Sequence, residues 1–270
     1  MAGDAHHPRT TSGHPSLARV YDYYLDGSLN SAIDRHLAEE LQDACPAIPR
    51  IIQHQRIFLR RSVQHMLQLG VRQFIDLGSG LPTAGHVHHL TCSYDPNIAV
   101  AYVDNDPMVV AHGRIILDST PNAEIFHADL RQPSEVLRHD GVCELIDLSE
   151  PVAITMVGVL EFISDHDNPA ALIADYRAAS EAKTFIALTM LTHANDPDRH
   201  RQLEHAAEIY RSAGAQLIVR PPETLHRWLA GMTIVTPASQ WSPDAQPPQP
   251  PQPDAELTLS ALIKHPATSQ

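Results

Sequence analysis

One segment, residues 74–83 with the sequence FIDLGSGLPT, constrains the fold of this chain more than any other. An apolar run ends at Asp76 and two glycines then flank a serine, which is typical of a buried strand that enters a tight turn and opens a helix. Because glycine has no Cβ, the backbone at Gly78 and Gly80 can approach a ligand closely. The Asp76 carboxylate would repel a pyrophosphate but suits an ammonium group. The segment therefore indicates a nucleoside-type cofactor that is cationic rather than polyphosphorylated.

The rest of the chain alternates between strand and helix patterns. Strands are predicted at residues 73–76, 100–103, 123–126, 151–157, 184–191, 232–235 and 257–263. Helices are predicted at residues 17–41, with a break near 26–28, and at 50–69, 84–90, 107–117, 134–137, 169–180, 198–213 and 222–229. This alternation predicts the α/β class, with a parallel sheet and helices on both faces.

Four of the predicted strands end at residues that suit a ligand, namely Asp76, Asp104, Asp129 and Gly158. Ligands of parallel sheets bind at the carboxyl ends of the strands, near the point where the strand order reverses. The shared placement of these four residues therefore predicts a single cofactor cleft.

Asp104 follows Gly78 at close to the ~20-residue offset at which an acidic residue binds ribose hydroxyls in nucleotide-binding folds. Its two oxygens can accept hydrogen bonds from both hydroxyls. The competing interpretation is an N-cap for the helix that begins at Pro107, a position for which Asn105 and Asp106 also compete. Asp129 follows a short strand in a similar way, and there a carboxylate can accept from an adenine amino group.

Taken in order, these residues resemble the first three motifs of the class I (Rossmann-like) S-adenosylmethionine-dependent methyltransferases. The matching residues are Asp76-x-Gly78-x-Gly80, the acidic Asp104, and residues 128–130, which read ADL. The resemblance implies a Rossmann-like, seven-stranded and mostly parallel sheet whose last strand is antiparallel. It also implies S-adenosyl-L-methionine as the cofactor and methyl donor.

The N-terminal region narrows the resemblance to one subfamily. Residues 18–30, which read ARVYDYYLDGSLN, are similar to the N-terminal signature of the actinobacterial-type methyltransferases long known as a domain of unknown function. Residues 70–83, 102–107 and 129–131 are also similar to core motifs of that subfamily. The resemblance extends from about Ser16 to Lys264.

This resemblance implies an N-terminal helical cap at residues 17–69 that covers the cofactor cleft, and a methyltransferase core at residues 70–270. The residues that it implies for cofactor binding are Tyr21, Tyr23, Gly27, Asn30, Asp76, Gly78, Gly80, Thr83, Asp104, Asn105, Asp129, Leu130 and Gly158. The two tyrosines also fit simple packing of an amphipathic helix.

Two positions depart from the subfamily pattern, because His86 stands where asparagine is usual and Glu161 stands where histidine is usual. An oxygen acceptor would need a general base. Glu161, His166 and His193 are the catalytic candidates, since all three fall on predicted carboxyl-end loops. Each of them also fits a solvated loop residue, and a nitrogen or carbon acceptor needs no dedicated base.

The net charge and the spacing of the histidines argue against nucleic-acid binding and against a metal site. The formal net charge of −13 argues against general nucleic-acid binding, which needs a basic surface to meet phosphates. Arg56, Arg60 and Arg61 are interpreted as a solvated helix face. The histidines within residues 86–89 have no carboxylate or cysteine beside them, so the sequence predicts no metal site.

The remaining segments suggest where the protein resides. No apolar stretch approaches the ~20 residues that a membrane span needs, so no membrane association is expected. Residues 1–16 are polar and lack the apolar core of a secretory signal, so a disordered tail and cytoplasmic residence are expected. The three cysteines are far apart, which suits a reducing compartment. Residues 242–254, rich in proline and glutamine, are predicted to form an exposed loop.

The predicted function is transfer of a methyl group to a small-molecule acceptor that the sequence does not identify. One alternative is a non-catalytic S-adenosylmethionine-binding regulatory or interaction protein, which the departures at His86 and Glu161 keep open. The other is an NAD-dependent oxidoreductase, against which Asp76 counts, as does Thr83 at the third position of the glycine fingerprint. The sequence indicates no oligomeric state.

Overall fold

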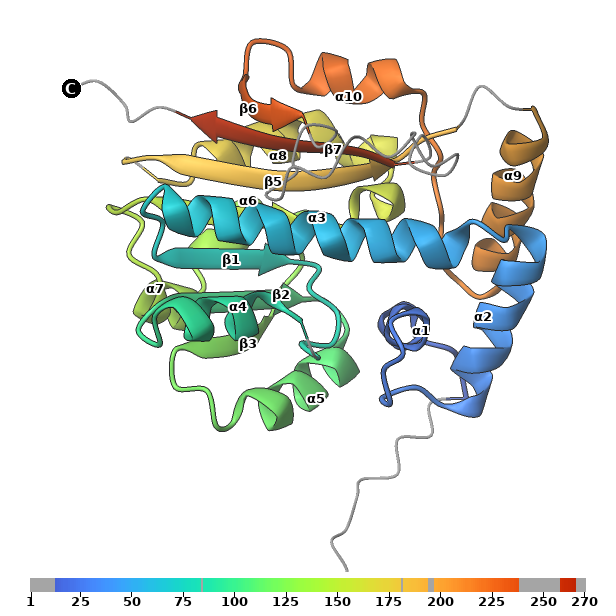
Figure 1. The fold of residues 1–270 in the computed structure, drawn as a ribbon, viewed down its shortest axis with the longest axis horizontal. Helices are drawn as coiled ribbons and strands as arrows, with labels where there is room; N and C mark the ends of the chain where they lie inside the picture. Colours follow the sequence, from blue (N-terminus) through green and yellow to red (C-terminus); the bar gives the residue numbers. More distant parts are fainter. Residues whose placement is uncertain (1–12, 84, 181, 194–196, 238–257, 266–270) are drawn as a thin grey trace, which may run out of the picture.

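The structure is a computed structural model that describes residues 13–83, 85–180, 182–193, 197–237 and 258–265. Within these residues a seven-stranded sheet lies between two layers of helices (Figure 1). The strand order is β3-β2-β1-β4-β5-β7-β6. The strands are β1 Gln73–Leu77, β2 Ala99–Asp104, β3 Ala123–His127, β4 Val152–Met156, β5 Thr184–Leu191, β6 Thr233–Pro237 and β7 Thr258–His265.

The direction of the strands confirms the predicted fold class. Strands β1 to β5 pair in parallel, whereas β7 is antiparallel to both of its neighbours, β5 and β6. The chain order reverses between β1 and β4, which lie side by side in the sheet. Their carboxyl ends therefore form the switch point at which a sheet of this kind binds ligands.

The described residues also form helices that mostly match the predicted ranges. The helices are α1 Leu17–Tyr24, α2 Ala32–Ala44, α3 Ile48–Gln68, α4 Val87–Tyr94, α5 Pro107–Leu117, α6 Pro133–Leu137, α7 Asp140–Leu145, α8 Pro169–Arg177, α9 Pro197–Ser212 and α10 Pro222–Trp228, with 3₁₀ helices η1 Leu160–Phe162 and η2 Asp165–Asp167. The helix predicted at residues 84–90 begins later, because Gly85 is in a left-handed conformation (φ 81°) that a continuous helix cannot contain. The short α7, η1 and η2 were not predicted.

Apolar side chains cover both faces of the sheet, because alternate residues of a strand point to opposite faces. In β2, Val100 and Tyr102 pack with α3, α4 and α5, while Ala101 and Val103 pack with the helices of the opposite layer. Every residue of β1 and β4 is buried. A strand buried on both faces has no solvent-facing side, which explains why neither strand alternates between apolar and polar residues.

A third apolar cluster joins α1, α2, α9 and the start of α3. It lies beyond the carboxyl ends of the parallel strands, and α3 continues from it along one face of the sheet (Figure 1). Within the cluster the Tyr24 hydroxyl donates to the Ala38 carbonyl at 2.6 Å, which joins α1 to α2. The N-terminal helices are thereby fixed next to the switch point of the sheet.

Several predicted segments are not tested by this structure. The division into a cap at residues 17–69 and a core at residues 70–270 stays a prediction. Of the predicted tail, residues 1–12 lie outside the described part of the chain, as does the whole predicted loop at residues 242–254. Among the described residues, no helix is both long and apolar enough to cross a membrane.

A buried ion pair fixes α1 against α2. Arg19 Nε donates to Asp34 Oδ2 at 2.7 Å, and the Asp34 side chain is fully buried. The Asp34 carboxylate also accepts from the backbone NH groups of Ser16, at 2.9 Å, and Ser31, at 2.8 Å. Burial alone would raise the pKa of Asp34, but the hydrogen bonds from Arg19 and the serines outweigh burial and lower this pKa.

Replacement of Asp34 by alanine is expected to lower the free energy of unfolding by about 3 kcal/mol, because it leaves the Arg19 guanidinium buried without its partner. Urea unfolding followed by circular dichroism measures this loss. The control is Asp43→Ala, at an exposed position of the same helix, which should change stability by less than about 0.5 kcal/mol. Equal effects of the two substitutions would contradict a structural role for the ion pair.

Candidate functional site

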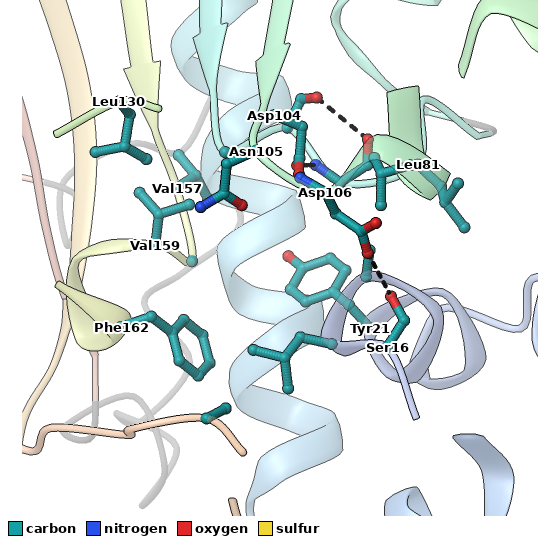
Figure 2. Close-up of a pocket in the computed structure, with 18 of the residues that line it drawn as sticks. Ser16, Tyr21, Leu81, Asp104, Asn105, Asp106, Leu130, Val157, Val159 and Phe162 are labelled. Atoms are coloured by element: carbon teal, nitrogen blue, oxygen red, sulfur yellow. Dashed lines mark hydrogen bonds between the residues drawn. The ribbon is translucent and has the colours of Figure 1, made fainter. Parts of the chain in front are cut away.

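A cavity of about 540 Å³ lies at the carboxyl ends of the parallel strands, at the switch point of the sheet (Figure 2). Its floor is formed by the loops that follow β1, β2, β3 and β4. Residues of α1 and α3 and the segment 213–216, which follows α9, form the other walls. The sheet and the N-terminal helices therefore enclose this cavity together.

Most of the residues predicted for cofactor binding line this cavity. They are Tyr21, Asp76, Gly78, Gly80, Thr83, Asp104, Asn105, Asp129, Leu130 and Gly158. Tyr23, Gly27 and Asn30 are not among the lining residues. The structure thus brings together the strand ends that the sequence singled out, while the binding role of each residue stays a prediction.

The turn after β1 requires glycine at the position of Gly78. Its backbone is left-handed, with φ 62°, and an added Cβ would lie 2.5 Å from Val159 Cγ1. The Gly78 NH donates to the Val103 carbonyl at 2.8 Å. A side chain at this position would therefore both strain the backbone and push apart the loops that follow β1 and β4.

Asp104 joins the loops after β1 and β2. Its Oδ2 accepts from the Gly80 NH at 2.8 Å and its Oδ1 accepts from the Asp106 NH at 2.9 Å. The competing N-cap role belongs to Asp106, whose side chain accepts from the Met108 NH at 2.8 Å. Each Asp104 oxygen retains a second lone pair for a ligand hydroxyl. Burial raises the pKa of Asp104.

Asp76 lies deep in the cavity wall, with 4% of its surface exposed. The Thr155 hydroxyl donates to its Oδ1, and His86 Nδ1 lies 4.0 Å from its Oδ2. Burial raises the pKa of Asp76 to about 6, although Thr155 and the charge of Arg56 act in the opposite direction. Burial also lowers the pKa of His86 well below its ordinary value, so this imidazole is neutral near pH 7.

Asp129, which also lines the cavity, is held by an ion pair. Arg131 donates to both carboxylate oxygens, with Nη2 2.5 Å from Oδ2 and Nε 3.0 Å from Oδ1. Arg131 Nη1 also lies 3.8 Å from Asp167 Oδ2. Burial alone would raise the pKa of Asp129, but the hydrogen bonds from Arg131 outweigh burial and lower this pKa, so the carboxylate is charged.

Gly27 and Asn30 contact the cavity through a residue that the sequence interpretation missed, Asp22. Asp22 lines the cavity, and its Oδ2 accepts from the Leu29 NH at 2.9 Å and from Asn30 Nδ2 at 3.2 Å. A Cβ on Gly27 would lie 2.1 Å from Asp22 Oδ1. Asp22 belongs to the same N-terminal signature, so the signal was present in the sequence.

The position of Arg56 differs from the one that the sequence predicted. The sequence predicted a solvated helix face for Arg56, Arg60 and Arg61, and Arg60 is indeed exposed. Arg56 instead lines the cavity, with its Cζ 5.5 Å from the centroid of the Tyr21 ring. The helical pattern of α3 gave no signal for this difference, because α1 covers only part of the polar side of α3.

The three catalytic candidates do not line the cavity. Glu161 is buried in η1, and its Oε1 accepts from Gln55 Nε2 at 2.8 Å. His166 is exposed in η2, and the ring of His193 packs against His200 at 5.3 Å between centroids. Their catalytic roles stay predictions. Within the described ranges, no group of three or more histidine, cysteine, aspartate or glutamate residues could hold a metal ion.

The sheet order, the glycine turn after β1 and the acidic residues at the switch point define the Rossmann-like fold of S-adenosylmethionine-dependent methyltransferases. Comparison with protein families agrees. The chain belongs to the S-adenosyl methyltransferase family, whose model matches residues 4–266. Its methyl donor is therefore S-adenosyl-L-methionine, which confirms the predicted family, enzyme class and cofactor.

Two crystal structures are similar over almost the whole chain. One is a proposed methyltransferase from Thermobifida fusca YX, with 32% identity over 96% of this chain and 98% of that one, and a TM-score of 0.85. The other is a DUF574 family protein from Streptomyces avermitilis MA-4680, with 25% identity over 94% of this chain and 98% of that one, and a TM-score of 0.84. No protein of curated function matches the chain.

Asp76→Asn is expected to stabilise the protein without ligand near pH 7.5. Burial raises the pKa of this carboxyl from 3.8 to about 6, and each pKa unit corresponds to about 1.4 kcal/mol. The ionised group therefore costs the folded state about 3 kcal/mol, which a neutral amide avoids. Because folding holds the proton more tightly, the gain should be complete above pH ~6 and shrink toward pH ~4.

Urea unfolding of both proteins at about pH 7.5 and pH 5 measures this difference, and subtraction cancels the other titrating groups. Asp118→Asn, at an exposed position after α5, is the control and should change stability little at either pH. A gain that is the same at both pH values would contradict a raised pKa at Asp76.

Proposed function

We propose that this enzyme transfers the methyl group of S-adenosylmethionine to a small-molecule acceptor, and that one cavity holds both. The main support is the cavity itself. Its volume of about 540 Å³ lies within the roughly 300–1,000 Å³ that is usual for small-molecule sites. The two ends of the cavity differ in chemistry, as a site for two different ligands requires.

The polar part of the cavity suits the cofactor. Leu130 and the side chain of Asp129 border the space for the adenine ring, and Asp104 offers its free lone pairs to the ribose hydroxyls. Asp76, ionised near pH 7 and buried, suits the methionine ammonium group. Gly78 and Gly80, both left-handed with φ 62°, line the cavity, so that backbone lines it at these two positions.

The apolar part of the cavity suits the acceptor. Phe162 and Tyr210 line it, with ring centroids 5.6 Å apart, and Ala213 and Ala215 lie on the segment that follows α9. In Figure 2, Phe162 lies beyond Val157 and Val159, away from Leu130. Aromatic walls of this kind favour an acceptor with an apolar or aromatic body.

When bound, the cofactor supplies a methyl group that its own sulfonium charge activates. The contribution of the protein is then to orient the acceptor and to exclude water. The catalytic candidates Glu161, His166 and His193 lie outside the cavity wall, and burial lowers the pKa of the lining residue His86 well below its ordinary value, which makes it a weak base. This arrangement favours an acceptor that needs no histidine general base.

A non-catalytic role receives no support from the family or from the fold. Turnover decides between the two functions. The enzyme is incubated with S-adenosylmethionine and a panel of small aromatic phenols, amines and carbon nucleophiles, and S-adenosylhomocysteine release is measured. Acceptor-dependent release above the rate without acceptor supports the methyltransferase, whereas cofactor binding with no release for any acceptor would favour the binding protein.

Asp104→Ala is expected to weaken S-adenosylmethionine binding about 100-fold, measured by isothermal titration calorimetry. The substitution removes two charge-assisted hydrogen bonds that hold the loops after β1 and β2, together with the proposed ribose acceptors, and each such bond contributes about 1.5–3 kcal/mol. Glu124→Ala, at an exposed position of β3, is the control and should bind normally.

Gly78→Val tests the same pocket by steric means, since its Cβ would meet Val159. Failure of the unaltered protein to bind S-adenosylmethionine would overturn the proposed use of this cavity. Normal binding by Asp104→Ala would instead refute only the role of that residue. Thermal unfolding of each variant distinguishes a folded protein that has lost binding from a protein that has lost its fold.

A further inference from the structure

Arg56 lines the cavity, and two of its guanidinium nitrogens have no hydrogen-bond acceptor among the described residues. These two atoms, Nε and Nη1, are shielded from solvent. The guanidinium lies over the Tyr21 ring, at 5.5 Å from the centroid, which holds the group in place through a cation–π contact. Buried donors without acceptors are costly, so a ligand that supplies acceptors gains from meeting them.

Arg56 differs from the other charged residues that line the cavity. The described acidic residues that line it include Asp22, Asp76, Asp104 and Asp129. The other lining arginine, Arg131, is already paired with Asp129 and Asp167. Within the described lining, Arg56 is therefore the arginine that forms no ion pair with a carboxylate. Its guanidinium charge is therefore available to an anionic ligand.

The cofactor of this family carries one anionic group. S-adenosylmethionine has a cationic sulfonium, a cationic ammonium and a single α-carboxylate. We propose that Arg56 binds this α-carboxylate and so anchors the methionine end of the cofactor. The planar guanidinium matches a carboxylate with two parallel hydrogen bonds. This inference rests on the proposed use of the cavity for the cofactor.

The position of Arg56 relative to Asp76 favours the cofactor over the acceptor as the source of the carboxylate. Asp76 and Arg56 line the same cavity, and the charge of Arg56 acts against the burial that raises the pKa of Asp76. The ammonium and carboxylate of methionine are attached to the same carbon atom. A ligand whose ammonium binds Asp76 therefore carries its carboxylate next to that ammonium, in the cavity that Arg56 also lines.

The test is a double-mutant cycle between the protein and the ligand. Isothermal titration calorimetry measures binding of S-adenosylmethionine and of decarboxylated S-adenosylmethionine to the unaltered protein and to Arg56→Met. The substitution also removes a positive charge beside Asp76, but both ligands keep the amino group. That side effect is therefore the same for both ligands and cancels in the cycle.

We expect Arg56→Met to weaken S-adenosylmethionine binding about 10- to 100-fold, and to weaken binding of the decarboxylated ligand much less. Arg56→Lys keeps the charge but not the two-donor geometry, so its loss should be intermediate. Arg60→Met, at the exposed position one helical turn further along α3, is the matched control and should bind both ligands normally.

Two outcomes overturn the inference in different ways. If Arg56→Met weakens both ligands by the same factor, or neither of them, Arg56 does not bind the cofactor carboxylate, although the cavity still holds the cofactor. If the unaltered protein binds neither S-adenosylmethionine nor S-adenosylhomocysteine, the proposed function itself fails. Thermal unfolding of each variant confirms that any loss of binding occurs in a folded protein.

Discussion

The carboxylate of Asp104 is the interaction on which the geometry of the cavity depends. One oxygen accepts from the Gly80 NH and the other from the Asp106 NH, so a single side chain joins the loops after two neighbouring strands. These hydrogen bonds fix the position of the glycine turn after β1 and of Asp106, which caps α5. Charge-assisted hydrogen bonds to backbone NH groups are strong. The two bonds of Asp104 therefore fix the loops that form the floor of the cavity.

The acidic character of the cavity explains why the protein suits a cationic ligand. Asp76 and Asp104 are both largely buried, and their mutual repulsion and desolvation work against folding. A ligand with two positive centres relieves both costs. Binding of such a ligand therefore recovers the folding free energy that the buried carboxylates cost, as is common where function requires buried charge.

Local patterns predicted much of the fold. The buried strands, the glycine turn and the acids at strand ends are short-range signals, because each depends on a few consecutive residues. The structure confirms the sheet and brings Asp76, Asp104 and Asp129 to one cavity. The exception is the start of α4, which lies after Gly85. A left-handed residue cannot be part of an α-helix, even where the spacing of apolar residues predicts one.

Contacts between distant segments were beyond that reasoning. Arg56 was assigned to solvent because its helix has a polar side, and only the position of α1 decides which part of that side is covered. Asp22 was passed over although its neighbours Gly27 and Asn30 were singled out, since their contacts with it depend on how the chain turns after α1. The first miss concerns packing of one helix on another, and the second concerns the turn that follows α1.

The contacts that hold α1 in place have a consequence for the mobility of the cavity wall. The Ser16 hydroxyl donates to Asp106 Oδ2 at 3.4 Å, which fastens the start of α1 to the cap of α5, and Arg19 fastens α1 to α2. These two contacts restrain α1, which forms part of the cavity wall. We therefore expect this wall to fluctuate less than a loop held by no side-chain contact would.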